Sequence, residues 1–266
     1  EAPDLPATEL EDYCYASMFA DCTSLKKIPS SLPATELGDH CYASMFAGCT
    51  SLEYVPIDFL PATIVGEYCY AGMFAGCTSL TIMPKVKAVS LSGCCCQDMF
   101  AGCTSLTRIF ELPATTLATC CYERMFEDCT SLVEAPNYML PATSVATLCY
   151  RSMFAGCTSL VSPPDLPATW LDSNCYQYMF SGCTSLVKAP YLPARTLIGY
   201  CYAGMFEGCT SLNYIKCNAE ININVNQTTT DWLKNVSPTG NFYKNANVNW
   251  PEGRSGVPLG WTVIDA

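Results

Sequence analysis

Apolar residues return every four positions within a short segment that occurs eight times along the chain. In the first copy, Leu10, Cys14, Met18 and Cys22 follow this spacing, and Phe19 lies beside Met18. Apolar side chains at positions i, i+4 and i+8 are typical of one face of a helix. The pattern therefore predicts a short helical segment in each copy.

The Met-Phe pair of this segment sets the period of the repeat. Consecutive pairs lie 26 to 28 residues apart. The methionines are Met18, Met45, Met73, Met99, Met125, Met153, Met179 and Met205. A period in the mid-twenties with Leu at fixed offsets is typical of a leucine-rich-repeat solenoid. Because each unit is too small to bury its own apolar face, neighbouring units must stack and share one core.

A short strand is predicted after each helical segment. In the first unit it covers residues 25–28, where two variable residues lie between Leu25 and Ile28. Pro29 ends the strand because Pro has no N–H to donate to a ladder. A Leu-Pro-Ala-Thr step at residues 32–35 then turns the chain back. The predicted fold is an α/β leucine-rich-repeat solenoid, a right-handed coil of parallel strands with short helical segments opposite.

The period ends after Leu212, and the last fifty residues are rich in Asn, Thr, Gly and Trp. Within them, residues 230–236 resemble a capped short helix, and residues 241–244 and 261–264 alternate as strands do. A solenoid needs its last coil covered, because an open core and a bare strand edge aggregate.

These observations divide the chain into two parts. Residues 1–216 are predicted to form the solenoid, with eight repeats of which the first is truncated at its N-terminus. Residues 217–266 are predicted to be a C-terminal capping region. Because residues 1–8 match the interior of a repeat, we expect any export signal to lie upstream. We also expect the uncapped first strand to allow edge-to-edge self-association.

Composition excludes several classes of protein. Half of the 266 residues are apolar and 14% are charged, so the chain is not a disordered tail. The net charge is −11 and the 13 Lys and Arg residues form no run, which argues against a nucleic-acid partner. No segment approaches the roughly 18 apolar residues that a membrane span requires.

Sixteen of the 20 Cys residues occupy two fixed slots per repeat, eight residues apart. If the intervening residues are helical, the two Cα atoms are about 12 Å apart, whereas a disulfide needs about 4.4–6.8 Å. Buried free thiols, disulfides within a repeat whose helix is broken, and metal or thiol chemistry all remain open. Zinc is disfavoured because the chain has one His and no Cys-x-x-Cys. Cys94 and Cys120 both precede their Met by five residues in adjacent repeats, and we predict a disulfide between them under oxidising conditions.

A search for catalytic residues finds no convincing set. His40 is the one His, and its slot holds Tyr, Leu, Asn or Cys in other repeats, as expected of a tolerant structural position. The acidic residues show no spacing typical of paired catalytic carboxylates, and no phosphate-binding Gly loop is present. The sequence therefore predicts no enzyme, no cofactor and no metal.

Eight copies of Met-Phe-x-x-Cys-Thr-Ser-Leu and seven Leu-Pro-Ala steps resemble the BspA-like class of bacterial leucine-rich repeats over residues 1 to about 216. Asp231-Trp232-Leu233 and the closing Gly260-Trp261-Thr262-Val263 are similar to the tails of the same proteins. The class is typical of Bacteroidetes cell-surface proteins. The resemblance implies export, often as an outer-membrane lipoprotein, and adhesion or host-matrix binding; it brings no catalytic residues. The unit here is longer than the family's usual one, through the added Leu-Pro-Ala turn.

The predicted function is an exported cell-surface binding or adhesion module, whose concave repeat surface holds a protein or glycan. Two repeats carry insertions directly after the strand, at residues 57–59 and 137–139, and insertions at one loop position mark one face of a solenoid. The candidate contacts are the variable strand pairs and two inserted aromatics: Lys26, Lys27, Glu53, Tyr54, Phe59, Thr107, Arg108, Tyr138, Val187, Lys188, Asn213 and Tyr214. The alternative function is a structural spacer or stalk that holds another domain away from the cell.

Overall fold

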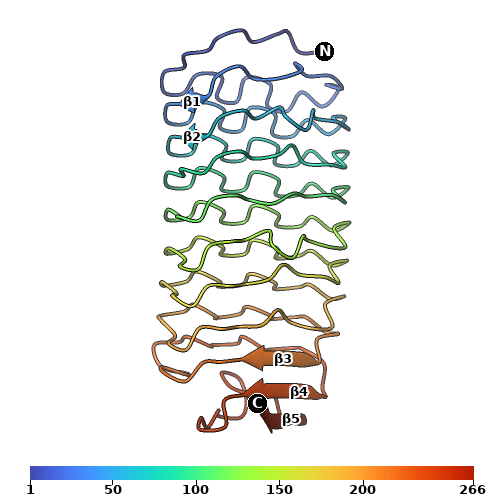
Figure 1. Cartoon of the computed structure of the whole chain (residues 1–266). Helices are drawn as coiled ribbons and strands as arrows, with labels where there is room; N and C mark the ends of the chain where they lie inside the picture. The colour runs from blue at the N-terminus through green and yellow to red at the C-terminus, as the bar shows by residue number, and fades with distance from the viewer.

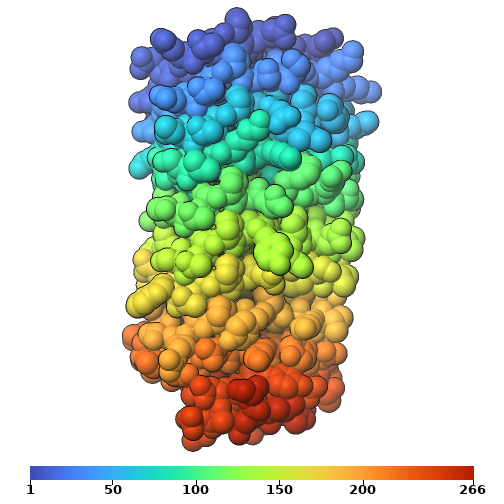
Figure 2. All heavy atoms as spheres, viewed as in Figure 1, coloured from blue at the N-terminus to red at the C-terminus, as the bar shows by residue number.

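The chain is wound into a single elongated stack of coils, with its two ends at opposite ends of the stack (Figure 1). This computed structural model describes all residues, 1–266. Parallel bridges such as Ile82 to Arg108 join residues one repeat apart. Side chains fill the surface of the column without interruption on the face seen in Figure 2. The stacking of successive repeats that the period predicted is confirmed.

Regular strands are few and lie mainly at the C-terminal end. The strands are β1 (Glu36–Leu37), β2 (Ile64–Val65), β3 (Tyr214–Cys217), β4 (Gly240–Lys244) and β5 (Trp261–Asp265). β1 pairs with β2, and β3, β4 and β5 form a three-stranded parallel sheet in that order. β4 and β5 confirm the two strands predicted in the closing region. Most of the strands predicted in the repeats are instead reduced to single bridges, such as Glu134 to Ser162.

The predicted helical segments are wrong, because the structure contains no helix. Each is a chain of tight turns that we call the turn ribbon, which covers residues 40–49 in the second repeat. The amides of His40, Tyr42 and Ser44 donate to carbonyl oxygens of the next coil at 2.7–3.0 Å. The amides between them, of Ala43 and Met45, donate to the carbonyl three residues earlier at 3.2 Å. In an α-helix every amide would bond within its own segment, whereas here every second amide holds two coils together.

Left-handed backbone at every fourth residue makes this ribbon and excludes the helix. The third residue after each repeat methionine is always Gly or Asp, and its φ lies between 57° and 77°. Gly adopts this conformation without penalty, and Asp tolerates it better than most residues. The helix predicted over residues 230–236 fails for the same reason, since Asp231 and Asn235 have φ values of 55° and 60°.

Two columns of aromatic rings form the centre of the core. The Phe of each Met-Phe pair stacks on the next at 5.5–5.7 Å between ring centroids, from Phe19 to Phe206. A parallel Tyr column begins at Tyr15 and ends at Tyr202. Cys96 replaces its ring in the fourth repeat. The repeats therefore share one continuous core.

Tryptophans close the C-terminal end of the core. Trp232 continues the Tyr column, 6.3 Å from Tyr202, and Trp250 stacks on its other side at 5.2 Å. The indole N–H of Trp232 donates to the carbonyl of Gly256 at 2.7 Å. The inter-coil ladder also continues here, because the amide of Gly208 donates to the carbonyl of Lys234 at 2.8 Å. The ladder thus crosses residue 216, and the division of the chain at that point stays a prediction.

The left-handed slot gives a direct test of the ribbon. Gly102 has a φ of 71°, and a Cβ added there would meet its nearest neighbours at 3.7 Å, which is ordinary contact. Gly102→Val should lower the free energy of unfolding by about 1–2 kcal/mol, because the strain comes from the backbone conformation. Gly102→Asn should cost clearly less, since Asn tolerates this conformation. Urea denaturation of both variants measures the difference, and equal losses would contradict the assignment.

Candidate functional site

The variable strand residues form one surface row, which we call the strand face. It comprises the two residues after the core Leu of each repeat, from Lys26-Lys27 to Asn213-Tyr214. Of the predicted contacts on this row, Lys26, Lys27, Glu53, Tyr54, Thr107, Arg108, Val187, Lys188 and Asn213 are exposed, and Tyr214 is half-buried. The structure therefore brings the predicted strand pairs onto a single face.

Two hollows join on the strand face into one trough. The first is lined by Thr107, Arg108, Phe110, Glu134, Asn137 and Ser162. The second shares Asn137 and Ser162 with it and extends to Asp165, Lys188, Tyr191, Tyr214 and Lys216. The trough therefore crosses the strand segments of five consecutive repeats. Separate hollows lie beside Lys26 and Lys27 and beside Glu53 and Tyr54.

The two inserted aromatics behave differently, and one prediction is corrected. Tyr138 is 83% exposed, but Phe59 is fully buried and packs between Phe46 and Phe74 at 6.1 and 6.3 Å. Each insertion closes a turn in which the amide of its third residue bonds back to a proline carbonyl at 3.0 Å. That turn directs Phe59, and likewise Met139, into the core. Phe59 is therefore a core residue and not a ligand contact.

Unpaired positive charge is concentrated on this face. Seven of the 13 Lys and Arg side chains lie within 4.0 Å of a carboxylate. The other six have no such partner, and all lie on or beside the strand face: Lys26, Lys27, Lys85, Arg108, Lys188 and Lys216. In a chain of net charge −11, this is where free cations gather.

Four of these cations lie over aromatic rings. Lys85 and Arg108 are 5.5 and 5.1 Å from the centroid of Phe110. Lys188 is 4.9 Å from that of Tyr214, and Lys216 is 5.6 Å from that of Tyr191. The sequence interpretation missed Lys85, Phe110, Tyr191 and Lys216. The signal for them was their place two or three residues after the variable strand pair of their own repeat.

All 20 cysteines are free. In seven successive repeats the thiol of the second slot donates to the carbonyl of the preceding repeat's Phe at 3.0–3.3 Å, as Cys103 does to Phe74. Cys therefore fills a small core site and adds one inter-coil hydrogen bond, although thiols are weak donors. Of the three interpretations left open by the sequence, buried free thiols describe this arrangement.

The predicted pair, Cys94 and Cys120, lies in adjacent coils with the two thiols unbridged. Burial and the neighbouring Cys94 thiol raise the pKa of Cys120 to about 12. The disulfide stays a prediction. His40 lies in the same column of the ribbon, where its ring stacks between Tyr13 at 4.5 Å and Tyr68 at 4.7 Å. Its surroundings are those of a stacking residue.

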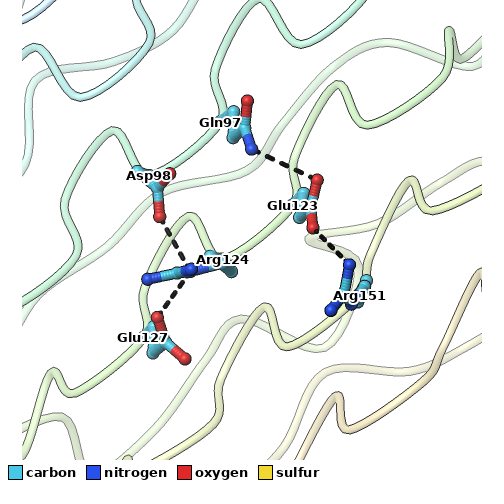
Figure 3. A network of polar contacts seen from close by, with 6 residues as sticks. All are labelled: Gln97, Asp98, Glu123, Arg124, Glu127 and Arg151. Carbon is cyan, nitrogen blue, oxygen red and sulfur yellow. Dashed lines mark hydrogen bonds and ion pairs between the residues drawn. The ribbon is translucent and has the colours of Figure 1, made fainter.

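A second polar cluster lies on the turn ribbons of the fourth to sixth repeats. Figure 3 shows Glu123 between Gln97 and Arg151, and Arg124 between Asp98 and Glu127. Glu123 accepts from Gln97 at 3.3 Å and from Arg151 at 3.2 Å. The ion pairs Asp98–Arg124 and Glu123–Arg151 link three coils. Each charged group of the cluster therefore has an oppositely charged neighbour within it.

Within this cluster, Asp98 is the poorly paired member. Arg124 Nε lies 2.6 Å from Glu127 and 3.0 Å from Asp98 Oδ1. Because its single hydrogen is donated to Glu127, Asp98 Oδ1 has an ionic contact but no hydrogen bond. Burial raises the pKa of the Asp98 carboxyl, and Glu123 raises it further while Arg124 opposes the change.

A family model described as BspA type leucine rich repeat region (6 copies) matches residues 7–81, 63–164 and 140–237. The chain belongs to this BspA-type family. The resemblance seen in the sequence is thereby confirmed, and with it the leucine-rich-repeat class of the fold.

A crystal structure of a leucine-rich repeat protein from Bacteroides ovatus ATCC 8483 is similar to this BspA-type chain at 17% identity. The match covers 98% of this chain and 83% of that one, with a TM-score of 0.28. No curated protein matches. No membrane-spanning helix is present in the structure of the BspA-type chain.

Thiol accessibility in the reduced protein follows from the burial of the slots. Only Cys22 is exposed, and Cys14 and Cys94 are half-buried. We expect these three to be alkylated rapidly at pH 8, and the other 17 only after denaturation. Burial raises the pKa of thiols such as Cys77 to about 12, which leaves little reactive thiolate. Mass mapping of a labelling time course checks this, and rapid labelling of Cys103 would contradict it.

The pKa of Asp98 predicts a pH-dependent effect of Asp98→Asn. Because the folded-state pKa is above the ordinary value of 3.8, the folded protein holds this proton more tightly than the unfolded chain. Ionisation of Asp98 therefore lowers the free energy of unfolding as the pH rises through the folded-state pKa of this carboxyl. We expect Asp98→Asn to match the wild type below pH 4 and to be more stable at pH 7.

Chemical denaturation at the two pH values measures this difference. Glu123→Gln is the matched control, since it leaves Arg151 without its carboxylate and should destabilise the protein at pH 7. A loss of stability at pH 7 in Asp98→Asn would show that its contact with Arg124 outweighs its burial.

Proposed function

We propose that this chain is a binding scaffold that holds a protein or glycan ligand on its strand face. The observation that carries the proposal is the concentration of the six unpaired cations on this face. Two exposed aromatics, Tyr54 and Tyr138, lie on the same face or its inserted loop, with 60% and 83% of their surface exposed. Exposed aromatic and Arg side chains commonly anchor partners.

The setting in which this scaffold acts is also proposed. Many BspA-type repeats are surface proteins, and binding is a common use of leucine-rich repeats. We infer an exported protein that acts in adhesion at the cell surface, without an enzymatic role. Its anchor, its signal segment and any self-association through strand edges belong to this proposal.

A spacer or stalk is the second candidate function. The two ends of the chain lie at opposite ends of an elongated stack (Figure 1), so the stack would separate whatever is attached to them. A spacer needs no ligand surface, and its function would survive loss of the exposed aromatics.

The two functions differ in their response to Tyr54→Ala combined with Tyr138→Ala. For a binding scaffold, a partner found on an array of glycans and extracellular proteins should bind about tenfold more weakly or worse, as expected when aromatic anchors are truncated. Titration calorimetry with that partner measures the change. Trp170→Ala is the control, because Trp170 is 76% exposed but lies outside the strand face.

Two results would contradict the binding proposal. A blank array would favour the spacer. Equal weakening by Trp170→Ala and by the double variant would remove the assignment of the site to the strand face.

A further inference from the structure

We infer that the trough binds a linear acidic polysaccharide, whose carboxylate or sulfate groups pair with Lys188 and Lys216. This inference rests on the proposed function and names the ligand class of the same face.

The two lysines form a crossed arrangement between neighbouring coils. Lys188 of the seventh repeat lies over Tyr214 of the eighth, and Lys216 of the eighth lies over Tyr191 of the seventh. All four side chains line the same hollow. Each ring lies beneath a lysine ammonium group, and neither ammonium group has a carboxylate partner. Two positive charges are thus held in place before any ligand arrives, which lowers the entropic cost of binding an anion.

The acids in the trough favour a sugar polymer over an acidic peptide. Glu134 and Asp165 line the trough between the cation clusters, and neither is paired with a Lys or Arg. A polypeptide with many successive acidic residues would be repelled at these two points. A polysaccharide carries hydroxyl groups between its acid groups, and hydroxyls donate hydrogen bonds to carboxylates. Asn137 and Ser162, where the two hollows meet, offer further polar partners of the kind that sugars use.

The lining of the trough is divided about equally between polar or charged residues and apolar ones. It therefore offers a ligand both hydrogen-bond partners and apolar surface, as a sugar chain with hydroxyl groups and C–H faces requires. The exposed ring of Tyr191, at 47%, offers an apolar surface to the C–H face of a sugar ring.

A second cation cluster sets a length requirement. Lys85 and Arg108 lie over Phe110, and Arg108 is three coils from Lys188, or roughly 14 Å at the usual spacing of neighbouring strands. A short oligosaccharide reaches one cluster, while a longer chain reaches both and gains from the second contact. The whole chain carries a net charge of −11, so most of its surface repels an anionic polymer. The unpaired cations on the strand face are where such a polymer is attracted.

The test uses the full chain and four immobilised polymers: heparin as the sulfated probe, polygalacturonate as the carboxylated probe, dextran as the neutral one and poly-glutamate as the acidic peptide. Biolayer interferometry should show binding to heparin or polygalacturonate that strengthens with polymer length and weakens with added salt. The comparison of these two probes identifies the acid group. Binding to dextran should be absent, and poly-glutamate should bind more weakly.

Lys188→Gln combined with Lys216→Gln should weaken acidic-polysaccharide binding by about tenfold or more, because two charge-assisted contacts are lost. The matched control, Lys26→Gln with Lys27→Gln, removes the same charge from the same face outside the trough and should change affinity by less than about threefold. All four positions carry no ion pair, so equal melting temperatures are expected and verify folding.

The inference is overturned if neither acidic polysaccharide binds, if poly-glutamate binds as tightly as they do, or if both double variants lose affinity equally. The proposed function has a separate outcome. An array partner that is lost with Tyr54→Ala and Tyr138→Ala would uphold the binding scaffold even where the acidic polymers fail.

Discussion

The alternation of backbone hydrogen bonds in the turn ribbon is the constraint on which this structure depends. One amide closes a turn within its own coil, and the next donates to the following coil. Three left-handed positions per repeat make this alternation possible, at the fifth and first residues before the methionine and the third after it. The ladder sets the register, and the register brings each Phe, Tyr and Cys over its counterpart. The aromatic columns and the thiol hydrogen bonds are consequences of it.

The sequence predicted the stacked repeats because its period is visible without any structural knowledge. It failed on the local conformation because a spacing of four residues resembles the 3.6-residue turn of a helix. Two signals pointed away from a helix. The spacing from Leu10 to Cys22 stays at four without the drift of a helical face, and the slot occupied by Gly48 accepts only Gly or Asp. Both are demands of a backbone that turns left-handed at regular intervals.

The candidate site was predictable to the extent that it follows from register. Variable residues between two core positions must point outward, and residues such as Tyr54 and Lys188 do so. The fate of Phe59 was not predictable in this way, because a turn inside the insertion reverses the direction of its third residue. The pairing of charges was also beyond the sequence, since Lys216 and Lys234 look alike until their neighbours in adjacent coils are known. Lys234 meets Glu207, while Lys216 meets only a ring.

The bonds between coils run along the axis of the stack, and this has a mechanical consequence. A pull applied at the two ends would act on the coil interfaces in series, so that every interface bears the full load. Extension would then begin at the weakest interface and proceed coil by coil. Each unfolded repeat would add the extended length of 26 to 28 residues. Under tension, a stack held together in this way would therefore lengthen in discrete steps.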